Sequence, residues 1–331
     1  MIGPMRYLEA VLTMSLAMNV AGGDGWLVAA NKGDATLGII DTAAGRQVAT
    51  VAEGGFTGHE TIVSPDGKTA YVPIYGNSGV GKPGTDGSKM VAIDIASRKI
   101  VGEVDFGHGV RPHCVQVGPK DGMLYVSTEL DRAVTIVDPK TLKVVGSAPT
   151  GQAESHMLVI DHAGRRAYTA NVGPGTVSVL DLAGRKVLKV IPISANTQRI
   201  AISTDDRWVF TADQTEARLA AISTATEAVE HWVELPGIGY GMAATPDGKW
   251  LVVALIGANQ VAVVDMKSLK VVKTVAVPAS PQEVLVRPDG RMVYVSCDAS
   301  AKVAAIRTGD WVVEGLIGAG KGVDGLAWAG R

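Results

Sequence analysis

The sequence predicts an all-β protein, a seven-bladed β-propeller with four antiparallel strands in each blade. A pattern that begins at His59, a polar residue followed by an apolar strand and a turn such as Ser64-Pro65-Asp66-Gly67, recurs along the chain. We call the first residues of the recurrences the lead residues: His59, His113, His156, Gln198, Tyr240, Gln282 and Asp324. They are separated by 54, 43 and then four times 42 residues. A repeat of this length is typical of propeller blades.

The two ends of the chain each supply part of one blade. Residues 25–51 contain three expected strands, at 26–30, 35–40 and 46–51, and lack a first strand. Residues 323–329 form a first strand without the other three. Joining the chain ends in one blade closes the ring and leaves no long free sheet edge. We therefore predict a single propeller domain over residues 25–331.

Composition excludes several classes of function. The chain has 331 residues and a net charge of −2, and no basic run is present that would neutralise phosphates. This argues against a nucleic-acid partner. The two cysteines, Cys114 and Cys297, are too few for a disulfide framework or a cysteine metal cluster.

Residues 1–24 lie outside the repeat. Arg6 precedes an apolar stretch at 11–20, which small residues at 21–23 follow. This order is typical of a secretory signal and predicts a periplasmic or secreted protein, although Glu9 suits the alternative of a short amphipathic capping helix. The apolar stretch is too short to span a bilayer, so no membrane span is expected. A closed propeller needs no second chain, and we expect a monomer.

The first interval between lead residues is longer than the others because of a glycine-rich insertion at 75–88. It falls between the second and third strands of its blade, a connection that lies on the same face as the lead residues. Its glycines do not match a phosphate-binding loop, and no helix follows. Because long loops in compact repeats are commonly functional, we interpret the insertion as a lid, with a neutral surface loop as the alternative.

Four segments carry a family resemblance, at residues 64–72, 124–127, 167–171 and 287–295. On these segments the chain resembles the YVTN β-propeller repeat family, within the quinoprotein-amine-dehydrogenase-like seven-bladed propellers. The resemblance implies the fold for about residues 25–331. It does not imply one activity, because the family includes surface-layer modules, periplasmic proteins and enzymes.

Three of the seven lead residues are histidine. The first strand of each propeller blade lines the central channel, so the lead residues point at one axis. The chain has six histidines, and seven random positions would hold about 0.1 of them. Three converging imidazoles suit Zn, Fe, Cu or Ni and leave a position open for water, as in catalytic sites. We predict a divalent transition-metal site on His59, His113 and His156, with a water-filled polar channel as the alternative.

Other channel residues receive expected roles from their positions. Tyr240, opposite the histidines, would stabilise a developing oxyanion, and Glu154 at the mouth would act as general acid or base. Arg111 would hold a substrate carboxylate. The residues expected to orient substrate or metal-bound water are Gln198, Gln282, Asp324, Tyr75 and Glu129. For Tyr75 and Glu129, turn formation is the alternative.

Side chains alternate between the two faces of a strand. Glu60 and Cys114 directly follow lead histidines. We therefore expect both side chains to point away from the channel and to lie between blades, with Cys114 in a packing role.

The run at 111–119, followed by Glu129, is similar to the Pro-His…Gly-Pro pattern of streptogramin-lyase-type propellers. Those are metal-dependent lyases with histidine and glutamate in the channel. The expected function is thus a metal-dependent lyase or hydrolase that acts on a small polar organic molecule. The alternatives are a non-catalytic propeller that binds a ligand or protein, and an oxygenase or oxidase that uses Fe or Cu at the same site. A redox partner in an amine-dehydrogenase-like system is disfavoured, because the chain has no haem motif.

Overall fold

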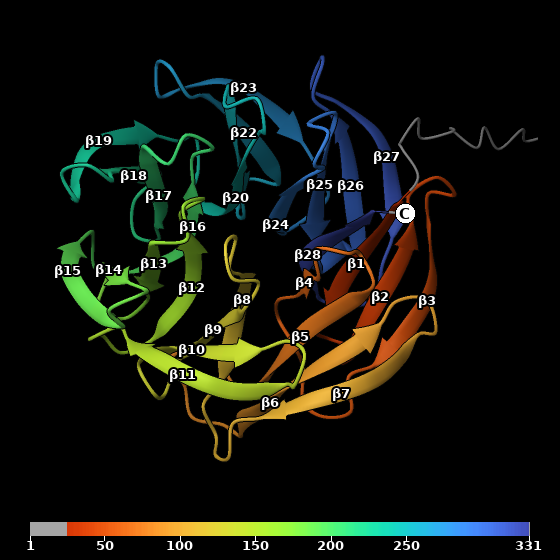
Figure 1. Cartoon of the computed structure of the whole chain (residues 1–331). Helices are drawn as coiled ribbons and strands as arrows, with labels where there is room; N and C mark the ends of the chain where they lie inside the picture. The colour runs from red at the N-terminus through yellow and green to blue at the C-terminus, as the bar shows by residue number, and fades with distance from the viewer. Residues whose placement is uncertain (1–24, 331) are drawn as a thin grey trace, which may run out of the picture.

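The computed structural model describes residues 25–330 and contains seven four-stranded antiparallel sheets arranged in a ring (Figure 1). This confirms the predicted seven-bladed propeller. Besides strands, the described residues form the 3-10 turn η1 (Asp298–Ser300). No helix within this range is long and apolar enough to cross a membrane. The segment expected to be a signal or a capping helix, residues 1–24, lies outside the described residues.

The blades order their strands from the channel outward. The innermost strands are β4 (Ile62–Val63), β8 (Pro112–Val117), β12 (Ser155–Ile160), β16 (Thr197–Ile202), β20 (Gly239–Ala244), β24 (Pro281–Val286) and β28 (Val323–Gly330). The second strands are β1 (Gly25–Asn31), β5 (Thr69–Gly76), β9 (Leu124–Thr128), β13 (Arg166–Asn171), β17 (Trp208–Asp213), β21 (Trp250–Leu255) and β25 (Met292–Cys297). Neighbouring innermost strands contact one another around the ring.

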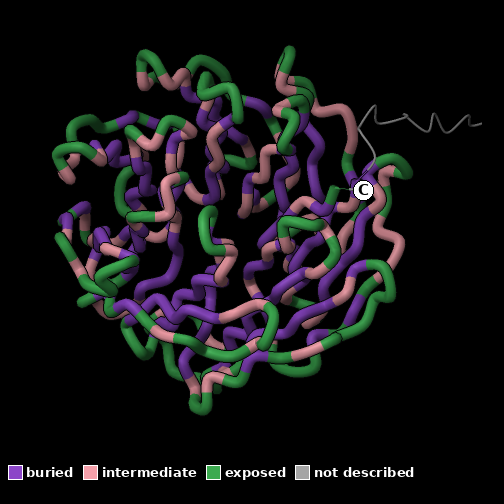
Figure 2. The backbone as a smooth tube through the Cα atoms, in the orientation of Figure 1, coloured by how far each residue is buried: buried purple, intermediate pink, exposed green. Residues whose placement is uncertain are grey.

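The other two strands of each blade lie farther from the axis. The third strands are β2 (Thr36–Asp41), β6 (Asp86–Asp94), β10 (Ala133–Asp138), β14 (Thr176–Asp181), β18 (Arg218–Ser223), β22 (Gln260–Asp265) and β26 (Lys302–Arg307). The outer strands are β3 (Arg46–Ala52), β7 (Lys99–Asp105), β11 (Lys143–Pro149), β15 (Lys186–Pro192), β19 (Ala228–Glu234), β23 (Lys270–Ala276) and β27 (Val312–Gly318). Figure 2 shows that the exposed residues gather at the turns and along these outer strands.

The chain ends meet in one blade, as the incomplete terminal units predicted. Strand β28 pairs antiparallel with β1, with Leu27 opposite Trp328. The sheet therefore runs β28-β1-β2-β3, and the ring is closed by hydrogen bonds between the first and last described strands.

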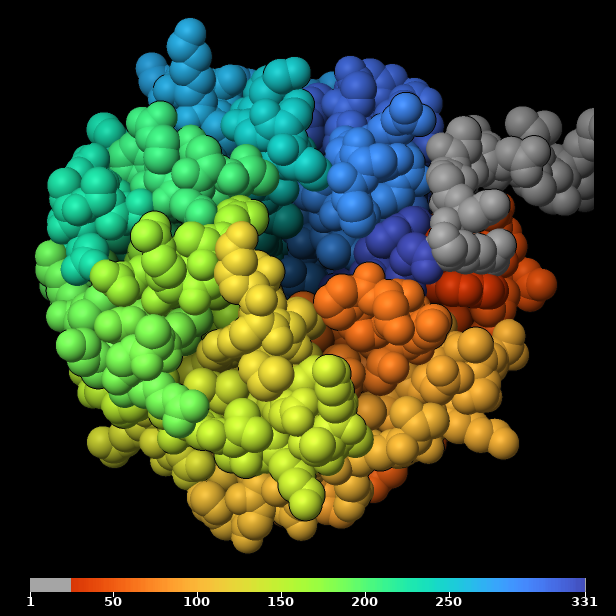
Figure 3. All heavy atoms as spheres, in the orientation of Figure 1, coloured from red at the N-terminus to blue at the C-terminus, as the bar shows by residue number. Residues whose placement is uncertain are grey.

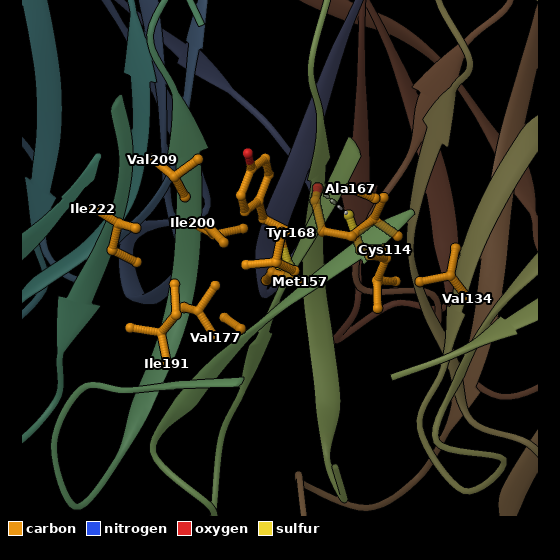
Figure 4. Packing of buried hydrophobic residues seen from close by; sticks show 14 of the residues in the cluster. Cys114, Val134, Met157, Ala167, Tyr168, Val177, Ile191, Ile200, Val209 and Ile222 are labelled. Carbon is orange, nitrogen blue, oxygen red and sulfur yellow. Dashed lines mark hydrogen bonds between the residues drawn. The ribbon is translucent and has the colours of Figure 1, made fainter. Parts of the chain in front are cut away.

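The core lies between adjacent blades. Second and third strands are buried almost throughout, and their apolar side chains pack against the next blade. In the cluster of Figure 4, Cys114, Met157 and Ile200 come from three consecutive innermost strands, and Tyr168 and Val177 from the strands behind them. Burial of one large apolar side chain contributes about 1.5–3 kcal/mol. These clusters hold the innermost strands in fixed positions around the channel.

Every innermost strand, or the segment leading into it, carries one extra residue around its lead position. In β16, Thr197 pairs with Asp213 and Ile200 with Thr211, so three steps along β16 match two along β17. The six other blades show the same excess of one residue. Such a bulge redirects the side chains around it, so the simple alternation of faces does not hold next to the lead residues.

Candidate functional site

Three histidines and one tyrosine meet in the channel. The ring centroids of His113 and His156 are 3.4 Å apart, and those of His59 and His113 are 5.4 Å apart. The ring of Tyr75, at the end of β5, lies 4.9–5.9 Å from all three imidazoles. The structure therefore brings together the three histidines that the sequence analysis proposed as ligands, and it adds Tyr75 to them. We call these four residues the histidine cluster.

The imidazoles of the histidine cluster are neutral at pH 7. Burial lowers the pKa of His59 to about 4, and it lowers the pKa of His113 and His156 as well. The Nδ1 atoms of His113 and His156 are buried and have no hydrogen-bond partner. A buried polar atom without a partner is costly, and neutral imidazole is the form in which histidine binds a metal ion.

Glu129 connects the histidine cluster to its surroundings. Its Oε2 accepts a hydrogen bond of 2.6 Å from the Tyr75 hydroxyl and lies 3.5 Å from His156 Nδ1. Its Oε1 lies 3.5 Å from both the Gly81 amide and Arg111 Nη1. Burial acts to raise the pKa of Glu129, but the contacts with His156 and Tyr75 outweigh it and leave the pKa below its usual range. Glu129 is therefore an ionised residue that orients Tyr75.

Arg111 holds the insertion. Its Nε donates to Asp86 Oδ1 at 2.6 Å and its Nη2 to the Lys82 carbonyl at 2.7 Å. At Gly81, where φ is +65°, a Cβ would lie only 2.6 Å from Glu154 Oε1, so the loop reaches past the next blade, β8–β11, and packs closely against the segment that leads into β12. The guanidinium of Arg111, expected to hold a substrate carboxylate, thus already binds the loop at 77–85 and the first residue of β6.

We expect Arg111→Met to release this loop, because the substitution removes the donors to Asp86 and Lys82. Hydrogen exchange measured by mass spectrometry should show amides at 77–85 exchanging at least about tenfold faster, while those of β9 stay unchanged. Arg132→Met is a matched control, since Arg132 is an exposed neighbour without a hydrogen bond to the loop in the described structure. Unchanged exchange at 77–85 would contradict the role given to Arg111.

An ion cluster fills another part of the channel. The buried Arg199 of β16 donates to Glu283 Oε2 at 2.8 Å, to Asp324 Oδ1 at 3.0 Å and to Glu60. Lys32 binds Asp324 at 3.1 Å. We call Arg199, Glu60, Glu283, Asp324 and Lys32 the ion cluster. It joins four innermost strands or their leading segments across the channel.

The ion cluster corrects the expectation for Glu60 and gives Tyr240 a neighbour. Glu60 was expected to point away from the channel, and instead it binds Arg199 because the bulge redirects its side chain. Tyr240 is expected opposite the histidines as an oxyanion donor. Its ring packs against Arg199, whose Cζ lies 4.6 Å from the ring centroid, and its donor role stays a prediction. Cys114, in contrast, is buried in the apolar cluster, as expected.

The remaining predicted site residues lie around this centre. Asp324 belongs to the ion cluster. Gln282 donates to Ser280 at 3.0 Å, and Glu154 accepts from the Gly173 amide at 2.8 Å. Gln198 is half-buried in β16. Within residues 25–330, neither glutamine nor Glu154 hydrogen-bonds to a histidine of the cluster.

Sequence reasoning missed Arg199 and Glu283. Both directly follow a lead residue, as Glu60 does. The signal that points to them is the set of opposite charges at this one position of the repeat, Glu60, Arg199 and Glu283, in strands that are otherwise apolar there.

No group of three or more His, Cys, Asp or Glu side chains in the described chain is arranged to hold a metal ion. The spacing of His113 and His156 is one reason. Two imidazole ligands of one tetrahedral ion have ring centres about 5 Å apart, whereas these centroids are 3.4 Å apart. A bound ion would require the two rings to separate, and the metal site stays a prediction.

The centre of the ring is hollowed on the face seen in Figure 3. A further cavity of about 330 Å³ opens beside Glu129, between the insertion loop and the segments at 129–132 and 153–154. Glu129 therefore lies between the histidine cluster and this second space.

Comparison with known proteins supports the fold. No protein-family model matches the chain, and no curated protein matches it. Among solved structures, a chain of Kuenenia stuttgartiensis hydrazine synthase is similar, with a TM-score of 0.67 and 20% identity over 92% of this chain and 99% of that chain. At this identity the likeness shows the propeller fold alone, and membership of the YVTN-repeat family stays a prediction.

Proposed function

We propose that His59, His113 and His156 bind one divalent transition-metal ion and that the site acts on a small polar organic molecule by lyase or hydrolase chemistry. The observation that carries the proposal is the convergence of three neutral imidazoles, two of which have a buried Nδ1 without a hydrogen-bond partner. An ion would satisfy the unpaired Nδ1 of His113, whereas Glu129, 3.5 Å away, is an acceptor for the Nδ1 of His156.

The neighbours of the histidines suit this role. Glu129 lies 3.5 Å from His156 Nδ1 and needs only a small movement to accept a hydrogen bond from it. A carboxylate in that position fixes the tautomer and leaves Nε2 free as a ligand. Burial and the contact with Glu129 raise the pKa of Tyr75, which stays protonated and donates its hydrogen bond to Glu129. A bound ion would polarise a substrate oxygen or activate water.

The ion cluster favours a cation nearby. Three carboxylates, on Glu60, Glu283 and Asp324, surround one guanidinium. Burial raises the pKa of Glu60 to about 7 and that of Glu283 to about 8, so the local positive charge does not fully stabilise their ionised forms. Burial acts to raise the pKa of Asp324 as well, but Arg199 and Lys32 lower it below its usual range, so Asp324 is ionised at pH 7 and its field would stabilise a divalent cation held by the adjacent imidazoles.

The test is X-ray absorption at the zinc edge of protein that was purified without a metal-affinity column and loaded with one equivalent of zinc. We expect three imidazole nitrogens at about 2.0–2.1 Å and one further light atom from solvent. His231→Ala, which removes an exposed histidine of β19, should give the same spectrum.

Two outcomes would overturn the proposal in different ways. A spectrum without imidazole ligands would remove the metal site. Three imidazoles with a fourth protein ligand in place of solvent would show a closed, structural site and would remove the catalytic part of the proposal.

A further inference from the structure

The cavity beside Glu129 is lined by both charged and apolar residues. Its most buried lining residues are Arg111 and Glu129. Lys82 and Arg132 line it from the insertion loop and from the turn after β9. Leu130 adds an apolar side chain that is 45% exposed. At about 330 Å³ the cavity is large enough for a small organic molecule.

The charges in this cavity are not balanced. Both carboxylates are occupied, since Glu129 accepts from Tyr75 and Glu154 accepts from the Gly173 amide. Arg111 is occupied by the loop. By contrast, the side chains of Lys82 and Arg132 have no hydrogen-bond or ion-pair partner within residues 25–330. The free charge that the cavity offers to a ligand is therefore positive.

We infer that this cavity is the subsite for a carboxylate group of the substrate, which makes the substrate a small organic anion. The inference rests on the function proposed for the histidine cluster. The planar guanidinium of Arg132 can donate two parallel hydrogen bonds to a carboxylate, and Lys82 adds a second positive charge. Leu130 contacts the apolar part of the same molecule.

The position of Glu129 connects the subsite to the reaction centre. Glu129 lines the cavity and also accepts the hydrogen bond of Tyr75. Arg111 lies 3.5 Å from its Oε1, so the negative charge of Glu129 is partly offset and does not repel a second anion strongly. A molecule anchored at Arg132 would lie on the cavity side of Glu129, the carboxylate of which contacts Tyr75 and His156 of the histidine cluster. The carboxylate binder is thus Arg132 with Lys82, in place of the Arg111 that sequence reasoning suggested.

Isothermal titration of succinate into metal-free protein at low salt tests the inference. We expect succinate to bind the wild type and succinamide, its uncharged analogue, to give no binding. Arg132→Gln should weaken succinate binding about tenfold or more, as expected for the loss of hydrogen bonds to a charged group, and Lys82→Gln should weaken it about threefold. Arg46→Gln, a change at an exposed arginine of β3, should have no effect.

Succinate binding that is absent from the wild type, or equal in the wild type and Arg132→Gln, would overturn the inference. Because the titration uses protein without metal, its outcome is independent of the metal proposal. Absence of succinate binding would not contradict the histidine metal site. Succinate binding would support the subsite even if the histidines bind no metal.

Discussion

Arg199→Met is expected to destabilise the propeller by about 3–5 kcal/mol, as found when one partner of a buried ion pair is removed. Arg199 is 2% exposed and binds Glu60, Glu283 and Asp324. Without it, three carboxylates stay in a poorly solvated channel with Lys32 as their nearest cation. Urea denaturation followed by tryptophan fluorescence gives the free energy of unfolding.

The pKa values of Glu60 and Glu283 determine how the destabilisation in Arg199→Met changes with pH. Burial holds the pKa of Glu60 at about 7 and that of Glu283 at about 8, whereas an unfolded glutamate ionises near pH 4.3. Between about pH 4.3 and 8 these two glutamates bind more protons in the folded protein than in the unfolded chain. Their protonation therefore stabilises the folded protein at low pH, and this stabilisation is lost as the pH rises from about 4.3 to 8. The destabilisation in Arg199→Met should be larger at pH 8 than at pH 5.

Arg307→Met provides the matched control. Arg307 also binds two carboxylates, Asp310 and Glu314, but its side chain is 47% exposed. Exposed ion pairs contribute about 1 kcal/mol or less, so this variant should be nearly as stable as the wild type. Equal effects of the two substitutions would show that the ion cluster has no special energetic role.

His113→Ala is expected to weaken zinc binding by a factor of about 100 or more, because it removes one of three proposed ligands; loss of a supporting residue alone typically costs about 10–100-fold. Competition with a chromophoric chelator measures the affinity. The propeller should stay folded, since the ring centroids of His113 and His156 lie only 3.4 Å apart at a tilt of 30°, and the loss of His113 relieves that crowding. Unchanged affinity, with an unchanged circular dichroism spectrum, would contradict the ligand assignment.

The sequence was sufficient to predict the fold because the same pattern recurs in every blade, so that each repeat supports the interpretation of the others. The lead residues recur at a nearly constant interval, and the incomplete units at 25–51 and 323–329 complement each other. The pairing of β28 with β1 follows from that complementarity. The convergence of the three histidines was predictable for the same reason, since equal positions in equal blades meet at one axis.

The ion cluster was not predicted because a strand was assumed to alternate its side chains strictly. The repeated bulge brings both the lead residue and the next residue toward the channel, as for His59 and Glu60. A bulge of this kind depends on pairing with the second strand, which the sequence of the first strand alone does not specify.

The role of Arg111 was missed for a different reason. Its partners, Asp86 and the Lys82 carbonyl, belong to an insertion that occurs once in the chain and lies outside the repeat. Periodicity carries no information about such a segment. Only the folded structure shows that the arginine at the mouth binds the loop, whereas the side chains of Lys82 and Arg132 beside the same cavity have no partner among residues 25–330.

The metal content of the protein tests the central claim most directly. Wild type and His113→Ala would be purified without a metal column, incubated with zinc, freed of unbound ions by gel filtration and analysed for metal and protein. We predict one zinc per chain in the wild type and close to none in His113→Ala. No zinc in the wild type, or one per chain in both proteins, would contradict the claim that these histidines form a metal site.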